Sequence, residues 1–252
     1  MGGGVAAQFV TGGASSAIDR GRQAGGSTGA VPQNSSAEQE LVAGALADKL
    51  TAPGLSPWVG ARAGIGFTSD AGVTWTGRSV RIDGRHAFES KHYALSIGLG
   101  ASGVLSQPGA DKPGQTARGG GDIPGVDSGG ASGWGLDVPV LVGYRSAASL
   151  IQVWGGVRGG FEHIGGDFYL RTDLDPTIEQ TAPVDARRWF AGGLIGIAVE
   201  IKPFWLGAEL DVAYQSLQGS LRLEDAGGGT RSMEATLSGL TVGPGGALAA
   251  RF

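Results

Sequence analysis

Large apolar side chains alternate with very small ones along most of this chain. In the stretch YALSIGLGASGVL, Tyr93, Leu95, Ile97 and Leu99 fall on one face, while Gly, Ala and Ser residues fall on the other. A strict period of two predicts a β-strand. A strand face that meets water usually carries Thr, Lys, Glu or Arg, so the second face must meet surroundings in which space is scarce.

The same alternation predicts a succession of strands separated by turn residues. Two tight hairpins are indicated, around Gly77-Arg78 and around Lys202-Pro203, because the apolar faces match across both turns. Across the first turn, Trp75 faces Val80 and Val73 faces Ile82. The predicted strand-forming segments are 57–67, 71–76, 79–88, 93–105, 133–144, 150–162, 189–201, 204–215 and 237–252.

The connections between these segments alternate between short and long. Tight turns are followed by polar stretches near 106–132, 165–186 and 223–232, which are rich in Gly, Asp and Pro. Short turns at one end of a sheet and long loops at the other are typical of transmembrane β-barrels.

The beginning of the chain differs in composition. Residues 1–37 are rich in Gly and Ser and predict a flexible N-terminal tail, so that the barrel would cover 38–252. Within 40–50, apolar residues lie at helical spacing, but the segment could equally be a first strand. The strand interpretation gives ten strands; a helix there, with 71–88 as one bent strand, gives eight. The hairpin at Gly77-Arg78 favours ten.

Composition excludes several classes of protein. The net charge of -4 gives no basic stripe for nucleic acid, and the absence of cysteine excludes disulfides and thiolate metal sites. A soluble barrel would also alternate, but it would carry more lysine at its edges. Aromatic residues instead lie near strand ends, where membrane interfaces would be: Trp58, Tyr93, Trp134, Tyr144, Trp189, Phe204 and Phe252.

These features together resemble the outer-membrane β-barrel proteins of Gram-negative bacteria over about four-fifths of the chain. The resemblance implies an all-β fold: a transmembrane antiparallel up-and-down β-barrel in the bacterial outer membrane, with both termini on the periplasmic side. It also implies contact with outer-membrane lipid and lipopolysaccharide, and insertion by the barrel-assembly machinery, read from Phe252 with Leu248. The first residues lack the pattern of a signal peptide, which we expect to have been removed.

Ten charged residues are predicted to face the lumen. Opposite charges in a narrow, poorly hydrated space should pair, and small barrels are filled by side chains. The favoured interpretation is a salt-bridged plug, and the alternative is a narrow porin-like channel for small solutes. The ten residues are Arg62, Arg81, Asp83, Arg85, Asp137, Arg158, Glu162, Arg188, Glu209 and Asp211.

An enzyme of the outer-membrane protease (omptin) type would need acidic residues and histidine at the loop rim. His163 with Glu162 and Asp167 is the one candidate group, and no second acidic pair can be placed opposite it. Carboxylates in 119–130 and 171–180 match no known calcium pattern, so no cofactor or metal is expected. The sequence thus predicts a non-catalytic protein: an anchor or subunit of an envelope complex, such as motility or transport machinery, or a scaffold that binds partners through surface loops.

Overall fold

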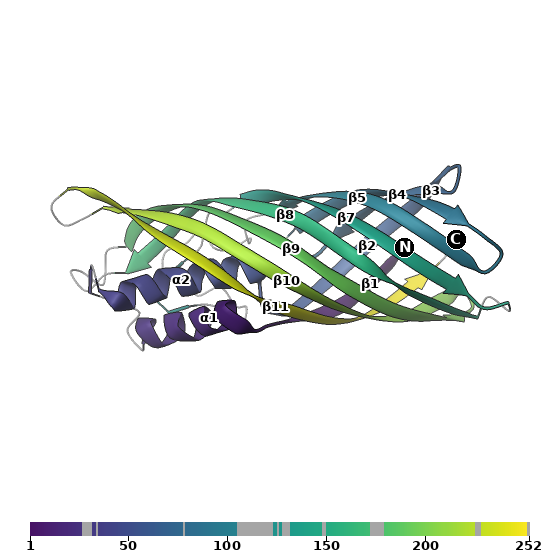
Figure 1. Ribbon diagram of the computed structural model, residues 1–252, viewed down its shortest axis with the longest axis horizontal. Coiled ribbons are helices and arrows are strands. Elements are labelled where there is room, and N and C mark those ends of the chain that lie inside the picture. Colours follow the sequence, from purple (N-terminus) through teal and green to yellow (C-terminus); the bar gives the residue numbers. More distant parts are fainter. Residues whose placement is uncertain are drawn as a thin grey trace.

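The strands form one closed antiparallel sheet (Figure 1). The computed structural model describes residues 1–26, 32–33, 35–77, 79–104, 123–124, 126–127, 132–147, 150–171, 179–224 and 228–250. Sequential strands are neighbours except for the short β6, which pairs with β8, and pairing of β8 with β9 closes the ring. Apart from the two-residue β6, ten strands form the wall. The predicted ten-stranded up-and-down β-barrel is confirmed.

The wall is much taller on one side than on the other. Strands β1 to β7 have at most 14 residues, whereas β8 to β11 have 21 to 23. The elements are β1 (Gly2–Val10), α1 (Gly12–Gly25), α2 (Ser36–Thr51), β2 (Gly54–Gly66), β3 (Ser69–Trp75), β4 (Ser79–Glu89), β5 (Tyr93–Val104), β6 (Val126–Asp127), β7 (Ser132–Arg145), β8 (Ile151–Arg171), β9 (Glu179–Ile201), β10 (Phe204–Glu224) and β11 (Thr230–Ala250).

Both predicted hairpins are present with the expected register. Trp75 pairs with Val80 between β3 and β4, and Ile201 pairs with Phe204 between β9 and β10. These pairings put the apolar residues of each hairpin on one face. Arg78 itself lies outside the described residues.

The predicted flexible tail is wrong. Residues 2–10 form β1, which lies between β2 and β11, and the Met1 amino group donates to the Ala250 carbonyl at 2.9 Å. The glycines that gave this segment a linker-like composition are needed for packing, since a Cβ on Gly4 would collide with the backbone of Gly246. The barrel therefore begins at Gly2 and not near residue 38.

The interpretation of 40–50 as the first strand is also wrong. This segment belongs to α2, whose N-terminus is capped by Ser35; the Ser35 hydroxyl accepts from the Glu38 amide at 3.1 Å. Leu46 and Leu50, at helical spacing, are buried. The strand count of ten stands because β1 supplies the strand that 40–50 does not.

An apolar band covers the outside of the barrel. It begins at the outward aromatic residues Trp134, Phe161 and Trp189 and ends near Tyr144 and Ile201 by the short turns. The twelve residue steps from Trp189 to Ile201 rise about 40 Å along the strand, or about 30 Å along the axis at a tilt near 40°. That height matches the hydrocarbon core of a bilayer. Trp58, expected at an interface, instead faces inward, because it alternates with the outward Val59.

Beyond the band, the apolar and polar faces of β8 to β11 are exchanged: the apolar face is now the inward one. Phe168, Val184 and Leu221 now point inward and are buried, while Arg187 and Gln218 point outward. The stretches near 165–186 and 223–232, predicted as long loops, are in large part strand. The reversal gives this end of the wall the polarity of a soluble protein, with its apolar side toward the interior.

Two helices fill that interior and pack against the tall wall (Figure 1). They cross closely at two glycines, where a Cβ on Gly44 would lie 2.7 Å from the Ala17 carbonyl oxygen. Leu46 of α2 sits on Gly219 of β10, and Ile123 covers the helix crossing. We call the two helices, together with 163–171, 179–187, 216–224 and 230–238, the lobe. No helix in the described part of the chain is long and apolar enough to cross a bilayer.

Candidate functional site

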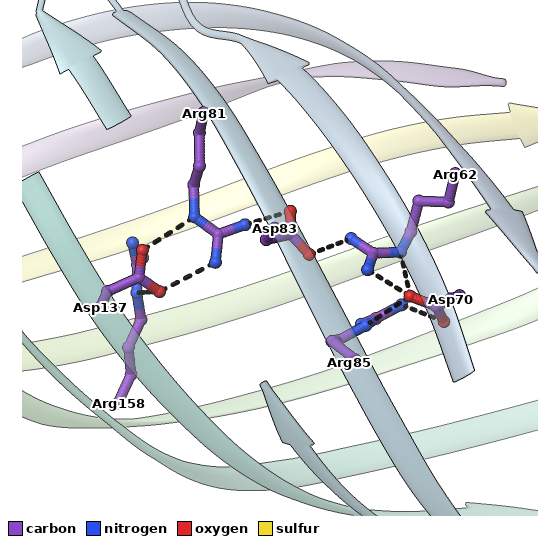
Figure 2. A network of polar contacts seen from close by, with 7 residues as sticks. All are labelled: Arg62, Asp70, Arg81, Asp83, Arg85, Asp137 and Arg158. Atoms are coloured by element: carbon purple, nitrogen blue, oxygen red, sulfur yellow. Dashed lines mark hydrogen bonds and ion pairs between the residues drawn. The ribbon is translucent and has the colours of Figure 1, made fainter. Parts of the chain in front are cut away.

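Seven charged side chains on the lumen face of the wall form one network, which we call the charged network (Figure 2). They come from β2, β3, β4, β7 and β8, and each contacts at least one residue of opposite charge. The seven are Arg62, Asp70, Arg81, Asp83, Arg85, Asp137 and Arg158.

Asp137 and Asp83 lie at its centre, and each is only 4% exposed. Arg81 binds Asp137 in a bidentate manner, with Nε to Oδ1 at 2.9 Å and Nη2 to Oδ2 at 2.8 Å, while its Nη1 reaches Asp83 at 2.5 Å. Arg158 approaches Asp137 at 3.2 Å. Buried charge is tolerated only when paired in this way.

The network continues toward the short turns through Asp70. Arg62 bridges Asp83, at 2.6 Å, and Asp70, and Arg85 contacts Asp70 at 3.2 Å. These three outer residues are more accessible to water than the central pair of aspartates.

Inward glycines give the arginines room to cross a neighbouring strand. Arg81 on β4 reaches Asp137 on β7 by passing over β5 at Gly100, where a Cβ would lie 2.6 Å from Asp137 Oδ1. Arg62 on β2 passes over Gly72 of β3 in the same way to reach Asp83, and a Cβ there would lie 2.7 Å from its Nη1. The strand face of Gly, Ala and Ser residues noted in the sequence is thus the surface on which the long arginine side chains lie.

A second, aromatic part joins the network on the tall wall. The Phe190 ring lies between two guanidinium groups, with Arg158 at 5.4 Å and Arg188 at 5.3 Å from its centroid. Arg188 then pairs with Glu162 at 2.7 Å. Phe190 lies over Gly160, whose Cβ would meet the ring at 2.5 Å. Contacts therefore run without a break from Arg85 to Glu162.

The two remaining predicted residues lie on β10. The Glu209 carboxylate accepts a hydrogen bond of 2.8 Å from the Trp154 indole, which passes over Gly196. Asp211 faces inward opposite Gly243 and makes no ion pair with another described residue. All ten predicted charges therefore face inward, and eight of them belong to the continuous set of contacts.

Sequence reasoning missed three members of this arrangement. Asp70 lies between the predicted strand segments 57–67 and 71–76, although it is the second residue of β3. Phe190 and Trp154 point inward among the small residues. Their inward position could have been found from strand parity, because each alternates with outward apolar residues.

The candidate catalytic group does not assemble. Glu162 points into the lumen toward Arg188, whereas His163 points outward toward Asp185 at 4.0 Å, and Asp167 has the same parity as His163. Of the two predicted insertion-signal residues, Leu248 faces outward and is exposed, and Phe252 lies outside the described residues. Among the described residues, no group of three or more His, Asp and Glu could hold a metal ion.

Within the lobe, a buried ion pair fastens α2 to β11. Glu38 of α2 is 1% exposed and contacts Arg231 of β11 at 2.5 Å. Arg22 of α1 and Asp48 of α2 approach to 3.7 Å and link the two helices. The helices are therefore held by charge as well as by the apolar core.

The fold and lumen define a transmembrane-type β-barrel. No family model matches the chain, and no curated protein matches it. Among solved structures, it resembles a crystal structure of a major outer membrane protein from Thermus thermophilus, with 17% identity and a TM-score of 0.35, over 78% of this chain and 98% of that one. At that TM-score the likeness adds nothing to the description of the fold, which rests on the strand pairing.

Proposed function

We propose that this chain is a non-catalytic integral protein of the bacterial outer membrane, whose barrel does not conduct and whose lobe is a rigid scaffold for binding at the cell surface. The lobe is the observation that carries the proposal. Strands of a barrel that only anchored itself would end near the membrane, but β8 to β11 continue for about eight to ten residues beyond the apolar band.

Two features of the interior support a non-conducting barrel. The charged network covers the lumen face of β2 to β8, and its central residues Asp83 and Asp137 are buried. Above it, the helices fill the interior of the lobe with an apolar core.

The position of the lobe supports display outside the cell. The helices and the extended parts of β8 to β11 lie at one end, and the short turns with both described ends of the chain lie at the other (Figure 1). In bacterial outer-membrane barrels the short turns are periplasmic.

Orientation can be tested with single cysteines, because the natural chain has none. Ser232→Cys lies on the outward face of the lobe, and Lys202→Cys lies in the turn between β9 and β10. A membrane-impermeant maleimide should label Ser232→Cys on intact cells and Lys202→Cys only after the outer membrane is permeabilised. The reverse pattern would contradict the proposal.

Conduction can be tested in planar bilayers. Refolded wild-type protein should insert and show no discrete current steps. Stable steps would contradict the proposed closed lumen and favour the alternative, a narrow channel for small solutes.

A further inference from the structure

The upper border of the apolar band carries a row of aromatic side chains. Trp134, Phe161 and Trp189 face outward on β7, β8 and β9, with ring centroids 5.4 Å and 4.5 Å apart. Trp189 is 61% exposed. In transmembrane β-barrels, girdles of aromatic residues lie where the hydrocarbon of the bilayer meets its headgroups.

Hydrogen-bond donors form the next row toward the lobe. His163, Arg187 and Gln218 are paired across β8, β9 and β10 and point outward. The His163 ring lies 6.2 Å from that of Trp134, so the two rows are continuous. These donors are therefore at the level of lipid headgroups.

Arg187 is available for a ligand. Its side chain is 60% exposed, and its contact within the described residues is with Asp185, at 3.9 Å from Nε. That separation is too long for a hydrogen bond. Asp185 also lies 4.0 Å from His163 Nε2, so it makes no close contact with either side chain.

The surface below the two rows suits acyl chains. On the outward face of the band, Gly159 pairs with Ala191 and Val157 pairs with Gly193. The small residues Gly159 and Ala191 lie between the larger Val138 of β7 and Tyr214 of β10. A lipid whose phosphate met Arg187 would lay its chains on this surface.

We propose that the row His163, Arg187 and Gln218 binds the phosphate of a lipid headgroup, namely that of the phosphorylated glycolipid in the outer leaflet. The guanidinium would hold the phosphate in a bidentate manner, the Gln218 amide would donate to it, and the three rings would cover the junction of headgroup and acyl chain. This site rests on the membrane location in the proposed function, and it does not depend on whether the lumen conducts.

The test is a binding measurement on the full chain in detergent micelles. Lipid A and the same lipid after enzymatic removal of its phosphates are titrated in turn, and the bound fraction is followed by native mass spectrometry. Wild type should prefer the phosphorylated lipid. Arg187→Gln should weaken lipid A binding about tenfold or more, the effect of losing a charge-assisted bidentate contact, without changing the weaker binding of the dephosphorylated lipid.

Arg222→Gln is the matched control. Arg222 is an exposed residue on the same outward face of β10, four residues beyond Gln218 and so about 13 Å from the row. This variant should bind lipid A as wild type does. Equal losses in the two variants would show a general charge effect and overturn the proposal.

Three other outcomes would also overturn it: unchanged lipid A binding by Arg187→Gln, equal affinity of wild type for the two lipids, or displacement of lipid A by inorganic phosphate at equal concentration. The last would assign the row to free phosphate. Since Arg187 is exposed, thermal unfolding without added lipid should be the same in both variants. A failed cysteine-labelling pattern would count against the proposed orientation, whereas loss of lipid preference in micelles would count against this site alone.

Discussion

Gly100, over which Arg81 passes to reach Asp137, gives the sharpest test of how the ion pairs of the lumen stabilise the barrel. Gly100→Ala adds one methyl group to the inward face of β5. The new Cβ would lie 2.6 Å from Asp137 Oδ1 and closer still to Arg81 Nη2. The three atoms nearest to the new Cβ all belong to these two side chains, so the substitution acts first on the ion pair itself.

The geometry sets the expected magnitude. Ordinary carbon–oxygen contacts need about 3.4 Å or more, so the guanidinium and the carboxylate must move by about 1 Å. Hydrogen bonds of 2.9 Å and 2.8 Å cannot both survive such a shift. Loss of one bond between charged groups lowers the free energy of unfolding by about 1.5–3 kcal/mol.

The assay is reversible urea unfolding in phospholipid vesicles, followed by the fluorescence of the six tryptophans. Two controls replace glycines with no atom within 4 Å of the added Cβ. Gly103→Ala lies on the same strand as Gly100, and Gly64→Ala faces inward as Gly100 does. Both should change stability by less than about 0.5 kcal/mol, since no neighbour must move.

A double-mutant cycle separates this explanation from a general effect on the strand. In an Arg81→Ala background, the methyl group at Gly100 no longer displaces a guanidinium, so its cost should fall by at least about 1 kcal/mol. Additive effects of the two substitutions, or a stability equal to that of the Gly103→Ala control, would refute the reasoning.

Three further substitutions test the band and the lobe. Val157→Arg, in the middle of the outward apolar band, should destabilise the inserted barrel by about 2–4 kcal/mol, measured by the yield of folded protein in vesicles. Gly44→Leu should force α1 and α2 apart at Ala17, because the Cβ meets backbone; hydrogen exchange should rise in the helices and remain slow in β4 and β5. Glu38→Leu removes the buried carboxylate that Arg231 contacts and should cost the lobe about 3 kcal/mol, seen as earlier proteolysis of the helices.

The alternation of side chains along each strand predicted which residues face the lumen, because this alternation is a local property of the sequence. Each side chain on a strand faces opposite to the next, so the inward position of residues such as Arg81 and Asp137 follows from the sequence around them. The partner of each charge does not follow, because Arg81 and Asp137 are on strands separated by β5. Their pairing depends on the register of three strands and on the glycine between them.

The sequence by itself determined the closed antiparallel barrel, its apolar outer face and its two tight hairpins, since all depend on a period of two and on short turns. Only the tertiary structure decided that residues 2–10 close the barrel against β11, because that contact joins positions more than 200 residues apart. It also decided the reversal of faces in β8 to β11. Beyond the band the surroundings of the barrel change from hydrocarbon to water, and α1 and α2 supply an apolar interior. The apolar residues of the alternating pattern therefore face inward there, and not outward as they do within the band.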